Sequence, residues 1–444
     1  MTKVFQRDTR SSLPVAMFGD GIYLIDSDGK RYLDASCGAA VSCLGHSDQD
    51  VIRAVKEQIE QLAFAHTGFF SSKPAEELAN FLINAAPNGI KMAYFVSGGS
   101  EAIETALKMA RQYHVEVGNE NRTHFIARKQ SYHGNTLGAL SVGGNFSRRA
   151  VYEEMLLATS HISPCYPFRY MIADETEQEY GYRVANELEA EIKRIGPDKV
   201  AAFVAETIGG ATAGVLPPVK NYFKYIREIC NKYGVLLILD EVMCGMGRTG
   251  TLFACEQENI SPDIICVAKG LGAGYQPIGA TLVQEKIYRA FFEGSGKFQH
   301  GHTYMGHPTA CAAALAVQEK IRDSDLLRGG QYKGKMMMDL LWEEFKNNVY
   351  VGDIRGRGLF FGIELVLDKV TKEPFPLHIN LHQKVKKNGL NNGLICYPGA
   401  GTANGVMGDH ILLAPPFIIT EKQIVELISL LARTIEESLA ETGL

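Results

Sequence analysis

The chain has 444 residues, with 45 Lys and Arg against 50 Asp and Glu and a formal net charge of −5 at pH 7. This length exceeds one typical hydrophobic core, so two or more packed lobes are expected. The charges are spread without long same-sign runs, which excludes a polyanion such as nucleic acid as the expected partner.

The nine cysteines form no CxxC pair, and several lie in apolar stretches. This spacing is typical of reduced thiols that pack as small hydrophobic side chains in the cytoplasm. The amino terminus lacks the apolar core of a signal peptide, and no apolar stretch reaches the roughly 20 residues of a membrane helix. The sequence therefore predicts a soluble, cytoplasmic protein with no membrane partner.

The first predicted element is a hairpin, because residues 21–25 and 30–33 alternate around a turn of Asp, Ser and Gly. From about residue 48 to 86 the apolar spacing is helical, and from there to about residue 320 strands alternate with helices. This alternation predicts an α/β fold with a large, doubly wound, mostly parallel sheet. The candidate strands are 93–96, 123–127, 200–205, 235–239, 264–268 and 278–283.

After residue 320 the pattern changes. It predicts a helix at 336–345, a strand at 359–365, a helix near 378–387 and a closing helix at 421–439. Turn-forming residues at 397–405 predict a loop. We therefore expect a large domain of residues 51–320 and a small α+β domain formed by both chain ends, residues 1–50 and 321–444.

Two charged residues follow predicted buried strands. Asp240 comes directly after 235–239, and Lys269 directly after 264–268. A carboxylate and an ammonium at the rim of an apolar sheet are costly unless they are paired or used, and ligands bind beyond the carboxyl ends of such strands. A lysine there can form a Schiff base, and an aspartate can keep a pyridine nitrogen protonated, so the pair indicates pyridoxal phosphate. A solvated aspartate and a lysine that only extends to solvent are the alternatives.

Other candidates are weaker when each is taken alone. Gly99 and Ser100 stand at the start of a predicted helix, where free amides and a hydroxyl bind phosphate, or simply cap the helix. Tyr132 could stack on a flat ring or pack in a loop. Glu206 ends strand 200–205, and its alternative is a surface salt bridge.

Two further patterns are excluded. His300, His302 and His307 have no carboxylate or cysteine at zinc-like spacing, so no metal site is predicted. Residues 294–298 lack the glycine and the hydroxyl residue of a P-loop, so a monophosphate fits this chain better than a nucleotide.

In this order the motifs resemble those of the class III pyridoxal-phosphate-dependent aminotransferases of fold type I, which include ornithine, 4-aminobutyrate and omega-amine:pyruvate aminotransferases. The resemblance covers nearly the whole chain. The motifs that carry it are Leu239-Asp240-Glu241-Val242, Gly245-Met246-Gly247-Arg248-Thr249-Gly250, Lys269-Gly270, Tyr132-His133-Gly134, His302-Thr303-Tyr304 and Ala414-Pro415-Pro416.

The resemblance implies that the cofactor is pyridoxal 5'-phosphate and that the enzyme is a homodimer or a higher homo-oligomer with shared active sites. It also implies the residue roles. Lys269 is the catalytic Schiff-base lysine and proton shuttle, and Asp240 is the catalytic partner of the pyridine nitrogen. Tyr132 and Val242 lie on the two faces of the ring, and Gly99 and Ser100 bind the phosphate. His133 and Glu206 are further cofactor-binding residues, and Thr303 contacts the phosphate of the neighbouring subunit.

The activity implied is ping-pong transfer of an amino group from an amine or omega-amino acid to a keto acid such as pyruvate or 2-oxoglutarate. A racemase, a decarboxylating aminotransferase and an amine phospho-lyase share these motifs and stay open as alternatives. A non-catalytic cofactor-binding protein is disfavoured, because Asp240 and Lys269 are both present.

The residue that binds the substrate carboxylate is not evident. Leu412 stands where many family members carry an arginine before the Ala-Pro-Pro motif, and no arginine occurs at 399–408. Either Arg148, Arg149 or Arg169 supplies the positive charge, or backbone amides of the 399–408 loop bind the carboxylate. The sequence leaves this choice open.

Overall fold

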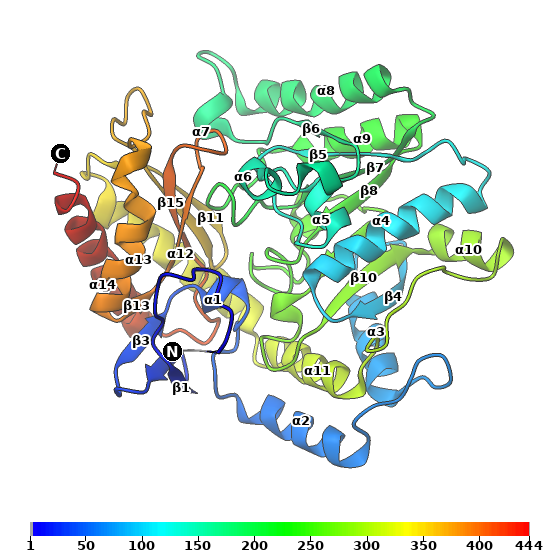
Figure 1. Cartoon of the computed structure of the whole chain (residues 1–444), viewed down its shortest axis with the longest axis horizontal. Helices are drawn as coiled ribbons and strands as arrows, with labels where there is room; N and C mark the ends of the chain where they lie inside the picture. The colour runs from blue at the N-terminus through cyan, green and yellow to red at the C-terminus, as the bar shows by residue number, and fades with distance from the viewer. Residues whose placement is uncertain (1–2, 444) are drawn as a thin grey trace.

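The computed structural model describes residues 3–443, which form three sheets covered by helices (Figure 1). The largest sheet has seven strands in the order β4-β10-β9-β8-β7-β5-β6. Its strands are β4 (Ile90–Val96), β5 (His124–Arg128), β6 (Thr159–Ile162), β7 (Val200–Glu206), β8 (Leu236–Asp240), β9 (Ile264–Val267) and β10 (Gly279–Gln284). Strands β5 to β9 pair in parallel, whereas β10 is antiparallel to both β9 and β4. The predicted mostly parallel α/β sheet is confirmed.

Helices connect these strands. They are α3 (Lys73–Ala85), α4 (Gly99–Glu116), α5 (Leu137–Val142), α6 (Phe146–Arg149), α7 (Pro167–Tyr170), α8 (Glu177–Ile195), α9 (Tyr222–Tyr233), α10 (Glu285–Glu293) and α11 (Pro308–Asp323). The described residues 3–443 also contain the short 3-10 helices η1 (Glu153–Met155), η2 (Ala254–Glu258), η3 (Lys269–Leu271) and η4 (Leu377–Ile379).

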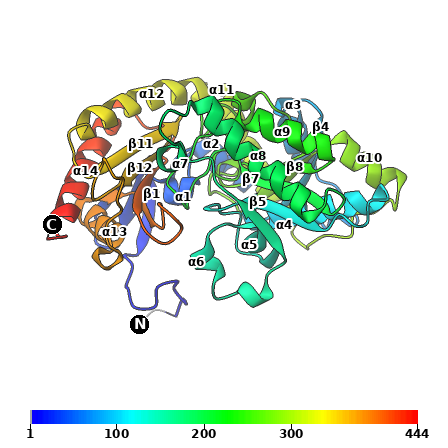
Figure 2. The same ribbon diagram turned by 90° about the horizontal axis from the view of Figure 1, so that it is seen from above.

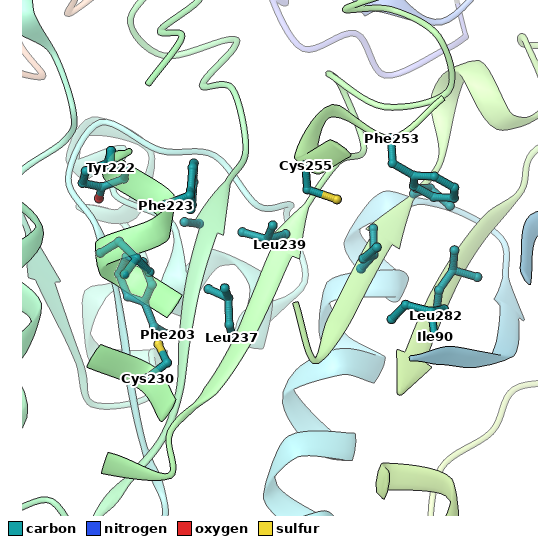
Figure 3. Packing of buried hydrophobic residues seen from close by; sticks show 14 of the residues in the cluster. Ile90, Phe203, Tyr222, Phe223, Cys230, Leu237, Leu239, Phe253, Cys255 and Leu282 are labelled. Carbon is teal, nitrogen blue, oxygen red and sulfur yellow. The ribbon is translucent and has the colours of Figure 1, made fainter. Parts of the chain in front are cut away.

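Helix α9 illustrates how the sequence builds this layer. Its apolar residues recur at helical spacing and are buried, and Gly234 ends it in the left-handed conformation with φ 63°. Figure 3 shows Tyr222 and Phe223 of α9 lying beside Phe203 of β7 and Leu239 of β8. This packing holds β7 and β8 in place below the ends that carry Glu206 and Asp240.

The two smaller sheets combine both ends of the chain. One contains β1 (Ala16–Asp20), β2 (Tyr23–Asp26), β3 (Arg31–Asp34) and β13 (Leu394–Ile395), and the other contains β11 (Val351–Arg357), β12 (Phe360–Leu365), β15 (Asp409–Leu413) and β14 (Tyr397–Ala400). Their helices are α1 (Cys37–Ala40), α2 (Gln49–Gln61), α12 (Leu326–Phe345), α13 (Leu381–Asn392) and α14 (Glu421–Ala440). Figure 1 shows the blue amino-terminal strands beside the orange and red carboxyl-terminal segments. We propose on this basis that residues 1–50 and 321–444 form one small domain beside a large domain of residues 51–320.

Several elements differ from the sequence prediction: β1, β11, β13 and β15 were not predicted, and α12 begins ten residues earlier than expected. Three further differences have a local reason. The helical region 48–86 is two helices, α2 and α3, because residues 62–72 leave the helical conformation. Strand β6 carries no strong apolar pattern and was not predicted. The predicted loop at 397–405 begins instead as β14, which is tolerated despite Pro398 because β14 is an edge strand that pairs only with β15.

The fold also bears on membrane association. Within residues 3–443, no helix combines the length and the apolar character needed to span a bilayer.

Candidate active site

A cavity of about 370 Å³ lies where β7 and β8 of the large sheet end. Eight of the nine predicted site residues line it: Gly99, Ser100, Tyr132, His133, Glu206, Asp240, Val242 and Lys269. They come from the start of α4, from the loop after β5, from the ends of β7 and β8, and from the turn after β9. The first and the last of these residues, Gly99 and Lys269, are 170 positions apart in the sequence, and the fold brings them to one cavity.

Asp240 is buried at the end of β8, and both of its carboxylate oxygens are held. Oδ1 accepts a hydrogen bond from the Val242 amide at 2.9 Å, and Oδ2 lies 2.7 Å from His133 Nδ1. A carboxylate only accepts hydrogen bonds when ionised, so Nδ1 of His133 carries the proton. His133 Nε2 is buried and finds no partner within residues 3–443. The histidine therefore serves to orient Asp240.

Glu206 is the cross-strand neighbour of Asp240 in the parallel β7–β8 pair. Its Oε1 accepts a hydrogen bond from the Gly210 amide at 3.2 Å. Burial raises the pKa of Glu206, and the charge of Asp240 adds to this, while His133 and Arg128 oppose it. Two carboxyl groups thus stand side by side at the cavity, and burial favours the protonated form of Glu206.

Lys269 opens the 3-10 helix η3 in a left-handed conformation with φ 49°. For a residue other than glycine this conformation costs about 1 kcal/mol or more, so the surrounding structure must hold it. Burial lowers the pKa of Lys269, with Asp240 and Glu206 opposing the shift. Its ammonium has no hydrogen-bond or salt-bridge partner among residues 3–443, so the amine is available for chemistry.

Gln318 of α11 fixes this turn, and the sequence reasoning missed it. The side chain is fully buried, and its Nε2 donates to the carbonyls of Gly270 and Leu271, both at 2.9 Å. A glutamine on the buried, alanine-rich face of a helix was the available signal. The partner of that glutamine, 47 or 48 positions away, could not be read from the sequence.

The start of α4 has the features of a phosphate site. The amides of Gly99 and Ser100 have no backbone acceptor in the described part of the chain, and a helix start favours anions. Ser100 Oγ donates to Asn135 Oδ1 at 2.8 Å and accepts from the Asn135 amide at 3.0 Å. A Cβ at Gly99 would lie 2.7 Å from Val242 Cγ1, and one at Gly134 would lie 2.6 Å from Ser100 Oγ. Glycine is therefore required for this close approach.

These residues fit pyridoxal phosphate. An anion site at a helix start, a buried acceptor held by His133, and an unpaired lysine line one cavity, which matches the phosphate, the ring nitrogen and the carbonyl carbon of that cofactor. Tyr132 and Val242 line the same cavity. Within residues 3–443 no cluster of His, Cys, Asp and Glu could hold a metal ion.

Thr303 is the one predicted residue that the structure does not bring to the cavity. It is exposed and lies in the segment between α10 and α11.

Leu412, which stands where many family members carry an arginine, is fully buried in β15 and packs in an apolar cluster with Ala40 and Met243.

Comparisons with known proteins find a family and relatives that match most of the chain. A family model described as aminotransferase class-III matches residues 5–435. An uncharacterised aminotransferase of Schizosaccharomyces pombe is 49% identical over 428 residues, covering 96% of this chain and 93% of the relative. The chloroplastic gamma aminobutyrate transaminase 3 of Solanum lycopersicum is 36% identical and covers 92% of this chain and 78% of that protein. Among solved structures, the Pseudomonas jessenii omega transaminase in complex with PMP has a TM-score of 0.92 at 32% identity, covering 99% of this chain and 97% of that one.

Proposed function

The chain belongs to the class III aminotransferases, which depend on pyridoxal phosphate, and we propose that it transfers an amino group from an amine or amino acid to pyruvate or 2-oxoglutarate. One observation carries the proposal. Asp240 and Lys269, from the ends of neighbouring strands, line the same cavity as the phosphate-type helix start of α4.

Lys269 and Asp240 have different proposed roles in the reaction. Bound pyridoxal phosphate supplies a carbonyl carbon for condensation with an amine and a ring that withdraws electrons from the substrate carbon. Lys269 would hold the carbonyl carbon of the cofactor and give up this position to the substrate amine. Its freed amine would then carry a proton to and from the substrate carbon, and its lowered pKa favours the neutral amine that this requires. Asp240 would hold a proton on the ring nitrogen, and His133 and the Val242 amide keep its carboxylate in position.

The remaining residues bind and orient. The amides of Gly99 and Ser100 would hold the phosphate, and Tyr132 and Val242 would cover the ring and exclude water. The carboxyl group of Glu206 would lie beside that of Asp240.

We also propose a homodimer. Thr303 is exposed outside the cavity of its own subunit, which supports a role at the cofactor phosphate of a second copy. All nine cysteines are free thiols, and this supports a reducing compartment such as the cytoplasm.

The test is the first half-reaction, measured with the holoenzyme and a panel of amines in the absence of any keto acid. A transaminase releases one equivalent of carbonyl product per subunit and then stops, and turnover resumes when pyruvate or 2-oxoglutarate is added. Continuous turnover without a keto acid would instead indicate a lyase or a racemase.

The matched control is Lys269→Ala. Borohydride treatment should fix the cofactor to a peptide containing residue 269 in the wild type and to no peptide in the variant. Cofactor fixed elsewhere on the variant chain would contradict the role of Lys269.

A further inference from the structure

A second, outer cavity of about 700 Å³ adjoins the first. The residues that line both are Tyr132, Gly134, Ala211, Met243 and Lys269. The charged side chains lining the outer cavity are those of Arg7, Arg148 and Lys269, and no carboxylate of residues 3–443 lines it. A site with cations and no anions favours a negatively charged ligand group. If the proposed aminotransferase function holds, that group is a substrate carboxylate.

The strand that often supplies the cation in this family cannot do so here. Leu412 is fully buried and packs with Ala40, Met243 and Phe360, so the surroundings of this position are apolar. A carboxylate placed against it would lose its hydration without gaining a partner.

The amides of the 401–408 loop are already used. The loop amides that donate within the loop are those of Gly401, Thr402, Ala403, Gly405, Val406 and Met407. The loop is further held from outside, because Gln130 Nε2 donates to the Thr402 carbonyl at 2.7 Å and the Tyr170 hydroxyl donates to the Ala403 carbonyl at 3.0 Å. This loop therefore offers little for binding a carboxylate.

Two of the three candidate arginines are also committed to structure. Arg149 is buried, donates to the Gly143 carbonyl at 2.9 Å and pairs with Glu153 at 3.3 Å. Arg169 donates from Nε to Glu364 at 2.6 Å. Neither lines the inner or the outer cavity.

Arg148 differs from both. It stands on α6, where the Asn145 side chain accepts a hydrogen bond from its backbone amide at 3.3 Å. Its guanidinium lies 4.7 Å from the centre of the Tyr132 ring and has no salt-bridge partner among residues 3–443. An arginine that stacks on an aromatic face keeps the N–H groups of its edge free to bind a carboxylate. Figure 2 shows α6 projecting from the body of the molecule on the side of the amino-terminal segment.

Arg148 lies apart from the reacting amine, yet its charge still influences that amine. Burial lowers the pKa of Lys269, and the charge of Arg148 acts in the same direction. Yet Arg148 lines only the outer cavity, while Lys269 lines both. An anion on Arg148 would therefore lie away from the reacting nitrogen, at the far end of a substrate that spans the two cavities.

We propose that Arg148 is the specificity-determining residue of this enzyme and that it binds the remote carboxylate of the amino donor in the outer cavity. Donors whose carboxylate is separated from the amine by several carbons are favoured over alkylamines of the same length.

The experiment compares matched donors in the first half-reaction of the holoenzyme. The series runs from 3-aminopropanoate to 6-aminohexanoate, each paired with the alkylamine of the same chain length. In Arg148→Met the ratio of kcat/KM between the best amino acid and its alkylamine should fall about 10- to 100-fold, the usual range for losing a charged hydrogen bond. Arg148→Lys should recover part of the ratio. Arg433→Met, a change at an exposed arginine of α14, is the matched control and should keep it.

A binding measurement keeps this test independent of turnover. Calorimetric titration of the holoenzyme with pentanoate, which carries the carboxylate but no amine, should give a Kd about 10- to 100-fold higher in Arg148→Met than in the wild type. If Arg148 only supported Tyr132, kcat/KM would fall equally for the amino acid and its alkylamine, and the ratio of the two values would not change. An unchanged ratio, or a fall in Arg7→Met but not in Arg148→Met, would overturn the proposal. Failure of the proposed function is a separate result, namely no carbonyl product from any amine in the wild type.

Discussion

The inner and the outer cavity are adjacent, but they are built in different ways. The inner cavity takes Glu206 and Asp240 from the ends of neighbouring paired strands, whose backbone hydrogen bonds fix their relative positions. The outer cavity takes Arg7 from the amino-terminal segment, Arg148 from a four-residue helix and Tyr397 from an edge strand. The sheet thus positions the groups proposed for the chemistry, whereas loops and short elements line the cavity proposed for the substrate.

The largest loss of activity is expected from Asp240→Asn in the inner cavity. The asparagine keeps the size of the side chain but loses the negative charge and offers an N–H group to His133 Nδ1, which itself carries a proton. We expect kcat to fall about 100-fold or more, as for removal of one charge-stabilising group. Thermal stability should change little. A kcat within threefold of the wild type would contradict the role of Asp240.

The next largest effect is expected from Leu412→Arg, in the buried cluster that contains Met243, a residue that lines both cavities. This change restores the arginine common in the family but places it in the apolar cluster around Met243 and Ala40. Burying an unpaired charge there should destabilise the protein by about 3–5 kcal/mol, measured by urea unfolding of the holoenzyme. Leu412→Met is the size-matched control and should cost about 1 kcal/mol. Equal stability of the two variants would mean that the arginine reaches the open cavity.

A smaller loss of stability and activity is expected from Gln318→Met, because Gln318 supports the turn that carries Lys269 into the inner cavity. The variant leaves the carbonyls of Gly270 and Leu271 without their buried donor, at a cost of about 1–3 kcal/mol. Because Lys269 depends on this turn for its left-handed conformation, kcat should fall with little change in KM for the donor. A change in KM alone would show that Gln318 supports the substrate side instead.

The smallest effect concerns His410, which supports the loop beside the outer cavity. Its Nδ1 lies 2.6 Å from Thr402 Oγ1, and burial lowers its pKa to about 3. In the unfolded chain the pKa is about 6.5, so between pH 6.5 and 3 the unfolded state binds a proton that the folded state does not. Stability is therefore complete above pH 6.5 and is lost as the pH falls, by up to about 1.4 kcal/mol per pH unit.

Replacement of this imidazole tests the assignment. His410→Gln should unfold at lower urea concentration at pH 7.5, yet its stability should depend less on pH between 6.5 and 4.5 than that of the wild type. His114 and His161, whose pKa values are each lowered to about 4 by burial, act in the same direction and remain in both proteins. Parallel stability curves would show that His410 does not titrate in this range.

The sequence predicted the inner cavity well for a physical reason. Asp240 and Lys269 follow apolar strands, and Gly99 begins a helix, so a local pattern marks each position and parallel pairing brings the strand ends together. Gln318 and the contact of His133 with Asp240 depend on tertiary packing across long stretches of chain, and no local pattern reports them.

The outer cavity was predicted less well. The choice among Arg148, Arg149 and Arg169 stayed open because all three are arginines in irregular or short helical segments. Only the contacts distinguish them: Arg149 and Arg169 pair with carboxylates, and Arg148 stacks on Tyr132. Likewise, Tyr397 to Ala400 has the composition of a loop, and only its pairing with β15 makes it a strand.

The parallel pairing of β3 with β13 has a consequence for synthesis of the chain. Leu33 pairs with Leu394, which is translated 361 residues later. At about 5–20 residues per second, β3 waits roughly 20–70 s for this partner while the seven strands of the large sheet are already complete. The first hairpin must therefore remain soluble, or be shielded by a chaperone, until Leu394 has been synthesised.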